Sequence, residues 1–203
     1  MNKGAIRTHF KALLNRSDIT DALADTFVDQ SISRIQRTLR VPAMEKIQTY
    51  TVSSQTAKIV VPNDLLEIIG IYHNTTSLTR LPLHDMLTAT ATGETGTANH
   101  FTQQGGDVLL FPQPISGTVS VSYYSQFADM SSDSDESSLA QFASDMIIYG
   151  ALTYASDYYL DDRGPIFEQK FVGMMSEIQE QAHDAANSGT IQVMRPSATY
   201  TDY

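Results

Sequence analysis

The 203-residue sequence contains no cysteine, so it can form no disulfide, thiolate metal site or cysteine nucleophile. Positive charge is also scarce. Lysine and arginine total 13 against 23 aspartates and glutamates, which gives a formal net charge of −10. A body this acidic repels phosphate backbones, which argues against non-specific nucleic-acid binding as the main function.

Long apolar runs are missing as well. The longest apolar stretch, Met146–Ala155, is interrupted by tyrosine, glycine and threonine and falls short of the roughly 18 residues that a membrane span needs. The N-terminal residues Met1–Arg7 lead into no apolar segment of the kind that follows the charges of a secretory signal. We therefore expect a soluble globular chain with no membrane partner, in which a hydrophobic content of 41% suffices for a core.

The usual catalytic motifs are missing too. Gly93–Gly96 has neither the spacing nor the lysine of a phosphate-binding loop. There is no Gly-x-Ser-x-Gly elbow, and the 5 histidines are scattered through different predicted elements. We predict that the protein is not an enzyme and binds no cofactor.

Three acidic groups could in principle hold a metal or move a proton. Glu180 and His183 form only half of a di-iron carboxylate motif. The acidic stretch at 129–136 lacks the glycine and the twelfth-position glutamate of a calcium loop, so a solvated loop that caps the next helix is favoured. Asp161 and Asp162 precede Gly164 at a turn, where helix capping is favoured. No metal site is predicted.

The first strong element is an amphipathic helix over 19–39. Its apolar residues follow a period close to 3.6: Ile19, Leu23, Phe27, Ile32, Ile35 and Leu39. Ser17 or Asp18 is expected to cap its start, and Pro42 to stop it. A shorter helix is predicted over 4–15.

From Ile47 onward the hydrophobic period changes to two, which predicts strands. The expected strands are 47–52, 58–61, 66–72, 78–83, 101–103, 108–111 and 119–124. Residues 104–107 form a hairpin turn signal, and the small residues of 88–99 are expected to form a loop. No long helix interrupts the series, so one antiparallel sheet of six or seven strands is predicted.

Helical periodicity then returns. One helical face carries Leu139, Phe142, Met146, Tyr149 and Thr153. Gly164 is expected to close this helix and Pro165 to open the next. That next helix has the cleanest pattern in the chain, with Phe167, Phe171, Met174, Ile178, Ala182 and Ala185 on one face.

The predicted fold class is therefore α+β. A helical bundle, made of the N-terminal helix and a C-terminal helix-turn-helix, carries an inserted antiparallel β-sheet domain and an extended C-terminal tail. The predicted boundaries are 1–46 and 137–189 for the bundle, 47–128 for the β domain, 129–136 for the acidic loop and 190–203 for the tail.

Three arginines, Arg34, Arg37 and Arg40, lie at the end of the first long helix. Cations are favoured there because they complement the negative end of the helix dipole. The same three arginines could instead bind a phosphate or a carboxylate of a partner. The spacing alone leaves both interpretations open.

An ordered series of short segments resembles the head-to-tail adaptor (connector) proteins of tailed bacteriophages, especially short-tailed ones. The series consists of Ile35–Arg40, Met44-Glu45, Pro62–Glu67, Leu109–Pro114, Tyr123-Tyr124 and Tyr159–Arg163. It runs in order over roughly residues 18–189, and the order is more specific than any single segment.

The resemblance implies a structural virion protein, made in the host cytoplasm and placed at the head-to-tail junction. Copies would form a ring, usually of twelve, between the portal protein and the tail tube or nozzle protein. Genomic DNA would pass through the lumen during ejection without being read. The acidic composition agrees, because a negative wall lets DNA slide.

Two sets of residues are the predicted contacts of such a ring. The tail carries apolar and aromatic residues suited to docking on the portal, unless it is only a frayed terminus: Ile191, Val193, Met194, Tyr200 and Tyr203. Arg34, Arg37 and Arg40 are predicted to pair with acidic residues of a neighbouring subunit.

Three alternatives remain open at this stage. One is a free-standing acidic inhibitor that mimics DNA, although 18% charged residues is low for a mimic. A second is another ring of the same virion, such as a nozzle component. A third is an enzyme whose aspartates and histidines meet only in the folded chain.

Overall fold

The N-terminal part of the chain forms an antiparallel helix pair. A computed structural model of the protein describes residues 1–53 and 56–187. Helix α1 spans Lys3–Leu14 and α2 spans Asp21–Thr38, as the periodicity predicts. The cap of α2 is Thr20, whose side chain accepts a hydrogen bond from the Leu23 amide at 3.2 Å. The predicted cap at Ser17 or Asp18 is wrong, because Asp18 is instead ion-paired with Arg16.

The two helices are joined by a ladder of three ion pairs. Lys3, Arg7 and Lys11 follow one another at steps of four on α1, and their partners Asp29, Asp25 and Asp21 do the same on α2. The central pair is the most buried, with Arg7 Nε 2.6 Å from one oxygen of the Asp25 carboxylate. Exposed pairs of this kind contribute about 0.2–1 kcal/mol each. The ladder therefore mainly sets the register of α1 against α2.

The C-terminal part of the bundle consists of α4 (Ser138–Phe142), α5 (Ser144–Tyr159) and α6 (Gly164–Asn187). The single helix predicted from Leu139 is wrong, because the chain breaks at Ala143, where φ is −139°. The Asp145 carboxylate accepts a hydrogen bond from the Met146 amide, a local bond that favours a helix start over a helix interior. As a result Phe142 is 46% exposed instead of lying on the buried face.

The turn between α5 and α6 is closed by Leu160, which adopts a left-handed conformation with φ 52°. The prediction that Gly164 closes the first helix is wrong, since Gly164 is the first residue of α6. Asp161 stabilises the turn by accepting hydrogen bonds from the backbone and side chain of Arg163. This ion pair lowers the pKa of the Asp161 carboxyl to about 2.

Helix α5 is the centre of the bundle and packs against α1, α2, α4 and α6. Its Gly150 allows the close approach of two neighbours. A β-carbon there would lie 2.2 Å from the Ser31 hydroxyl of α2 and 2.9 Å from the Phe171 ring of α6. The Ser31 hydroxyl donates to the Ile147 carbonyl at 2.8 Å, so this buried polar group is satisfied.

The inserted segment folds into two four-stranded sheets and not into the single sheet that was predicted. The first has the order β1-β8-β3-β4 and the second the order β2-β7-β6-β5. The strands are β1 (Glu45–Ser53), β2 (Lys58–Val60), β3 (Leu65–His73), β4 (Thr76–Ser77), β5 (Thr79–Arg80), β6 (His100–Gln104), β7 (Asp107–Phe111) and β8 (Ser116–Ser125). All pairs are antiparallel except β5 with β6.

The largest difference from the sequence prediction lies at residues 78–99. The predicted strand over 78–83 is reduced to the two residues of β5, and α3 (Leu83–Thr90) replaces the start of the expected loop. Pro82 is the residue before α3, and Met86 on this helix is fully buried. The small threonine and alanine residues of this segment are typical of a loop. Helix α3 nevertheless forms, packs against β6 and β7, and buries Met86.

The β domain has its own core between the two sheets. Its fully buried residues are Ile71, Ala98, Val108, Leu110, Val119 and Val121. His73 of β3 links its own strand to the segment at Ala98 and to the start of β8 through hydrogen bonds. Its ring accepts a hydrogen bond from the Ala98 amide at 3.0 Å through Nδ1, and its Nε2 donates to the Ser116 carbonyl at 3.0 Å.

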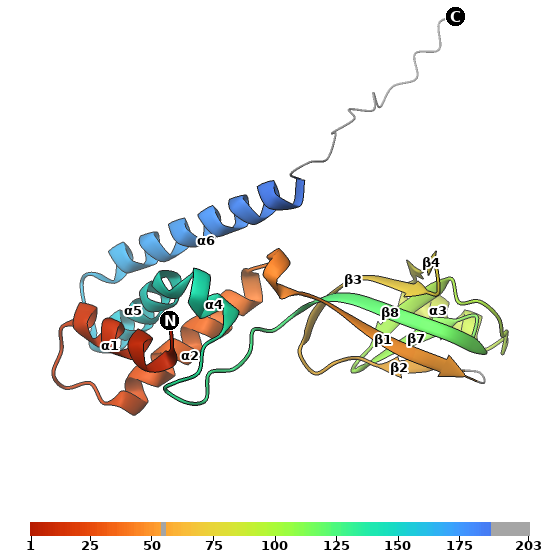
Figure 1. Ribbon diagram of the computed structural model, residues 1–203, viewed down its shortest axis with the longest axis horizontal. Helices are drawn as coiled ribbons and strands as arrows, with labels where there is room; N and C mark the ends of the chain where they lie inside the picture. Colours follow the sequence, from red (N-terminus) through yellow and green to blue (C-terminus); the bar gives the residue numbers. More distant parts are fainter. Residues whose placement is uncertain (54–55, 188–203) are drawn as a thin grey trace, which may run out of the picture.

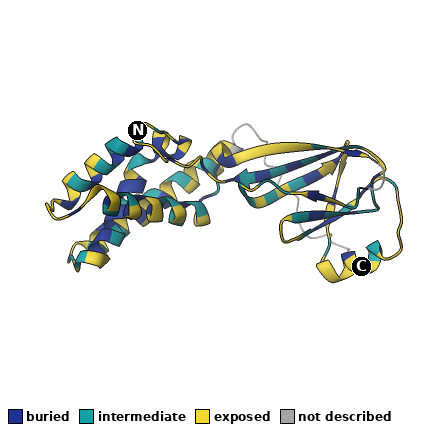
Figure 2. Ribbon diagram, turned by 90° about the horizontal axis from the view of Figure 1, so that it is seen from below, coloured by how far each residue is buried: buried dark blue, intermediate teal, exposed yellow. Residues whose placement is uncertain are grey.

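The bundle and the β domain lie at opposite ends of an elongated molecule (Figure 1). They are joined by the short 3₁₀ helix η1 (Pro42–Met44) and by the segment 126–137. Buried residues gather in two separate places, one in each domain (Figure 2). The predicted fold class, a helical bundle with an inserted antiparallel β domain, is confirmed.

Candidate subunit and partner interfaces

The arginine stripe at the end of α2 separates into three different environments. Arg34 forms a bidentate ion pair with Glu168 of α6, and its Nη1 lies 2.8 Å from one carboxylate oxygen. Its guanidinium also lies 4.4 Å from the centre of the Phe171 ring. Arg34 is therefore engaged within the subunit, where it fastens α2 to α6.

Arg40 is engaged within the subunit as well. Its Nε lies 2.9 Å from the Glu67 carboxylate of β3, and its Nη1 donates to the carbonyls of Gln36 and Leu39 at the end of α2. The carbonyl contacts are the helix-end complement expected for a cation at this position. The pair with Glu67 crosses from the bundle to the β domain.

Arg37 is the exposed member of the stripe. It makes no hydrogen bond or ion pair with any residue in the described part of the chain, 1–53 and 56–187. It lies at the edge of two surface cavities, of 570 Å³ and 410 Å³. Of the three predicted subunit contacts, Arg37 is the one that has no competing partner within the described fold.

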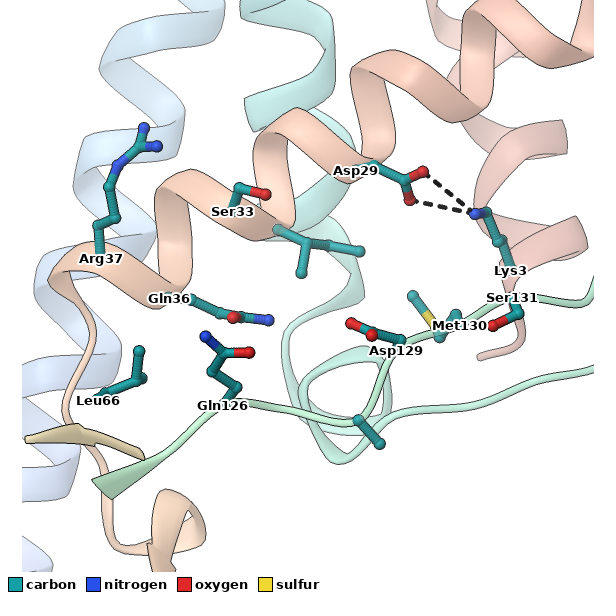
Figure 3. A pocket seen from close by; sticks show the side chains of 12 residues that line it. Lys3, Asp29, Ser33, Gln36, Arg37, Leu66, Gln126, Asp129, Met130 and Ser131 are labelled. Carbon is teal, nitrogen blue, oxygen red and sulfur yellow. Dashed lines mark hydrogen bonds and ion pairs between the residues drawn. The ribbon is translucent and has the colours of Figure 1, made fainter. Parts of the chain in front are cut away.

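The larger cavity is a polar cleft between α2 and the segment 126–131 (Figure 3). Gln36 of α2 and Gln126 of the segment line it, and the Lys3–Asp29 ion pair, with an N–O distance of 3.1 Å, lies along one side. The cleft is open and mixed in polarity, with none of the enclosed apolar lining typical of a small-molecule site.

The acidic segment 129–136 is bound to the start of α1. The carbonyls of Asp135 and Asp133 accept hydrogen bonds from the amides of Lys3 and Gly4, both at 3.0 Å. The Asp133 carboxylate pairs with Arg7, which lowers the pKa of that carboxyl. The next helix is capped by Ser137 and not by an acidic residue. Segment 129–136, which was predicted to be a solvated loop, is therefore bound to the helical bundle by these hydrogen bonds and this ion pair.

The groups considered for metal or proton chemistry do not converge. Glu180 and His183 lie on the outer side of α6, and Asp161 is engaged with Arg163. Within residues 1–53 and 56–187, no three histidine, aspartate or glutamate side chains form a metal-binding group. In the same part of the chain, no helix is long and apolar enough to cross a membrane.

The five predicted tail contacts lie outside the described residues: Ile191, Val193, Met194, Tyr200 and Tyr203. Two charged features were not predicted: the ion ladder between α1 and α2, and a row of acids on α6. Both have a sequence signal, because their charges recur at helical spacing. Glu177, Glu180 and Asp184 are three and four residues apart, which places them on one helical face.

The Arg34–Glu168 pair is expected to make the stability of the bundle depend on pH. Arg34 lowers the pKa of the Glu168 carboxyl, so the stabilisation by this pair is present above the ordinary glutamate pKa of about 4.3 and is lost as the pH falls through the lowered value. We expect Glu168→Gln to destabilise the protein at pH 7 by about 0.5–1 kcal/mol, allowing for partial exposure.

The difference in unfolding free energy between wild type and Glu168→Gln should shrink as the pH is lowered from 7 to below the ordinary glutamate pKa of about 4.3, as followed by urea unfolding at each pH. Asp162→Asn is the matched control, because Asp162 has no ion pair among the described residues. An equal effect of the two substitutions at pH 7 would contradict this account of the pair.

The architecture defines a class: an elongated α+β protein with a helical bundle at one end and a β domain at the other (Figure 1). The family model of the SU10 adaptor protein matches residues 1–194, and the chain belongs to this family. It is a bacteriophage structural adaptor of the head-to-tail type, a virion component that associates with portal and tail components. A search among curated proteins found no match.

Proposed function

We propose that copies of this chain form a ring of twelve between the portal and the tail of a short-tailed phage. In this role the chain bridges the portal protein to the tail tube or nozzle protein, and genomic DNA passes through the lumen without sequence readout. The observation that carries the proposal is the match to an adaptor family over residues 1–194, which includes both domains.

The shape of the subunit supports a bridging role. The bundle and the β domain lie at opposite ends (Figure 1), and each has a separate hydrophobic core. A subunit with two independently built ends can present different surfaces to two different partners.

The charge of the subunit supports a lumen that DNA traverses. The net charge is −10, because 23 aspartates and glutamates outnumber 13 lysines and arginines. A wall of this sign repels phosphates and does not retain DNA through counterion release.

Of the arginine stripe, we propose that Arg37 provides the contact to the neighbouring subunit. Arg34 and Arg40 already have carboxylate partners in their own chain, at 2.8 Å and 2.9 Å. Recruiting either one would break an existing pair, whereas Arg37 can form a new pair without such a loss.

We also propose that the C-terminal tail docks on the portal. Deleting residues 190–203 is expected to reduce binding to isolated portal rings at least 100-fold, because the tail carries a cluster of apolar and aromatic side chains suited to an interface. Both described domains end before this segment, so thermal unfolding should remain unchanged. Portal binding is measured by sedimentation, and unchanged binding would show that the tail is dispensable.

The proposed function is tested by counting this chain against the portal protein in purified phage particles with quantitative mass spectrometry. A ratio near one per portal subunit would support the ring. Absence from the particle would overturn the proposal and favour the acidic DNA-mimic alternative. A ratio near one, with the chain cross-linked only to distal tail components and never to the portal, would favour a nozzle component.

A further inference from the structure

The order of helices in the bundle gives it two outward faces. Helix α5 packs against both α2 and α6. Helices α2 and α6 also contact each other, through the Arg34–Glu168 ion pair and a hydrogen bond from the Gln179 side chain to the Thr38 carbonyl. Figure 1 shows α6 along one side of α5 and α2 along the other. Glu168 of α6 faces α2, and Glu177, nine residues further on, lies on the opposite side of α6 because one turn takes 3.6 residues. The acidic side of α6 therefore points away from α2.

The outer face of α2 consists of small or uncharged residues followed by one arginine. Its exposed positions include Ala22, Thr26, Gln30, Ser33 and Arg37. All carboxylates of α2 are ion-paired with α1 through the ladder described above. Arg37 is thus the uncompensated charge that α2 itself contributes to this face.

The outer face of α6 is acidic, in contrast to that of α2. Gly173, Glu177, Glu180 and Asp184 are exposed and recur at steps of three and four, so they form one row along the helix. No lysine or arginine of residues 1–53 and 56–187 pairs with these three acids. A β-carbon at Gly173 would meet no atom within 4 Å, so this part of the row is open to a neighbour.

We propose that the α6 outer face of one copy packs against the α2 outer face of the next copy, with Arg37 inserted among Glu177, Glu180 and Asp184. This inference rests on the proposed function, since it specifies how the ring is built. Joining two different faces of identical subunits is a head-to-tail contact, the type that closes into rings, whereas a contact of one face with itself would stop at a dimer.

The surface around Arg37 suits a helix as the occupant. The cavities of 570 Å³ and 410 Å³ flank α2, with Tyr154 lining the smaller one, so the exposed residues of α2 form a ridge between two depressions. Helices pack by placing the ridges of one in the grooves of the other. The charge of Arg37 favours an acidic helix, and α6 of a second copy supplies one. The Asp129 carboxylate lies on the other side of the larger cavity, away from Arg37 (Figure 3).

A cysteine-pair experiment tests this contact, because the natural chain has no cysteine to interfere. Full-length Ser33→Cys and Glu177→Cys proteins are mixed on portal rings and treated with a short bismaleimide. We expect a cross-linked dimer containing one copy of each variant. Ser33→Cys mixed with Glu94→Cys, an exposed position in the β domain, is the control and should give none.

A charge exchange tests the role of Arg37 in the same assembly. Arg37→Glu is expected to weaken self-association at least tenfold, and Glu180→Arg in the same chain should restore most of it. Arg80→Glu is the matched control, since Arg80 on β5 is exposed and has no ion pair among the described residues, and the net charge changes equally. The Arg80 variant should assemble like wild type.

The possible outcomes separate this inference from the proposed function. Rings that form with one copy per portal subunit but give no Ser33–Glu177 cross-link would overturn the α2–α6 contact while leaving the adaptor ring in place. A cross-link between two Ser33→Cys copies would show a two-fold contact and overturn the head-to-tail arrangement. If no copies assemble on the portal under any condition, both the ring and the contact are wrong.

Discussion

Gly150→Leu is expected to destabilise the protein by about 1–3 kcal/mol or more, one of the two largest effects we anticipate from a single substitution. The added side chain would have to displace the Ser31 hydroxyl, which lies 2.2 Å from the position of a β-carbon, and the Phe171 ring at 2.9 Å. Both neighbours are buried, so neither can move into solvent. The three helices α2, α5 and α6 would be forced apart.

The matched control is Gly173→Ala. Gly173 also lies in a helix interior, but no atom would lie within 4 Å of an added β-carbon. Alanine is favoured over glycine in helices by about 1 kcal/mol, so this variant should be slightly more stable than wild type. Urea unfolding followed by circular dichroism measures both variants. Equal effects at the two glycines would refute the close helix approach at Gly150.

Leu110→Ala is expected to destabilise the β domain by about 2–5 kcal/mol, because it leaves a cavity in a fully buried position. Leu110 lies on β7 and belongs to the core between the two sheets, which is separate from the core of the bundle. Each core buries its own apolar residues, so the loss should be felt mainly in the β domain.

Hydrogen exchange read by mass spectrometry can assign the loss to a domain. Amides of β6, β7 and β8 should exchange faster in Leu110→Ala, while amides of α5 should keep the protection seen in wild type. Ile47→Ala provides a control, since Ile47 is 72% exposed and its truncation should change stability by less than about 0.5 kcal/mol. Equal loss of protection in both domains would mean that they unfold as one unit.

The sequence predicted the long elements well where one period dominated a segment. The apolar spacing of α2 and α6 and the alternation along β8 each required only one buried face, and local periodicity reports such a face directly. Prediction failed at α3, at the break before α5 and at the division into two sheets. These features depend on Met86, on the local bond of Asp145 and on long-range strand pairing, none of which alters local periodicity.

The sequence predicted that three arginines lie together, but not which of them is available to a neighbouring subunit. Helical spacing brought Arg34, Arg37 and Arg40 to one end of α2, but it could not show that two of them are engaged within the chain. Their partners, Glu168 and Glu67, lie more than a hundred and more than twenty residues away in sequence. Pairing at such distances is decided by tertiary structure.

By itself, the sequence determined the fold class, the acidic character and the family resemblance, because these follow from composition, periodicity and an ordered series of local segments. Only the tertiary structure decided that α5 packs against both α2 and α6, that the carboxylates of α2 are neutralised by α1, and that Arg37 has no partner among the described residues. The physical reason is that burial and charge pairing depend on which distant segments meet, and local sequence does not record that.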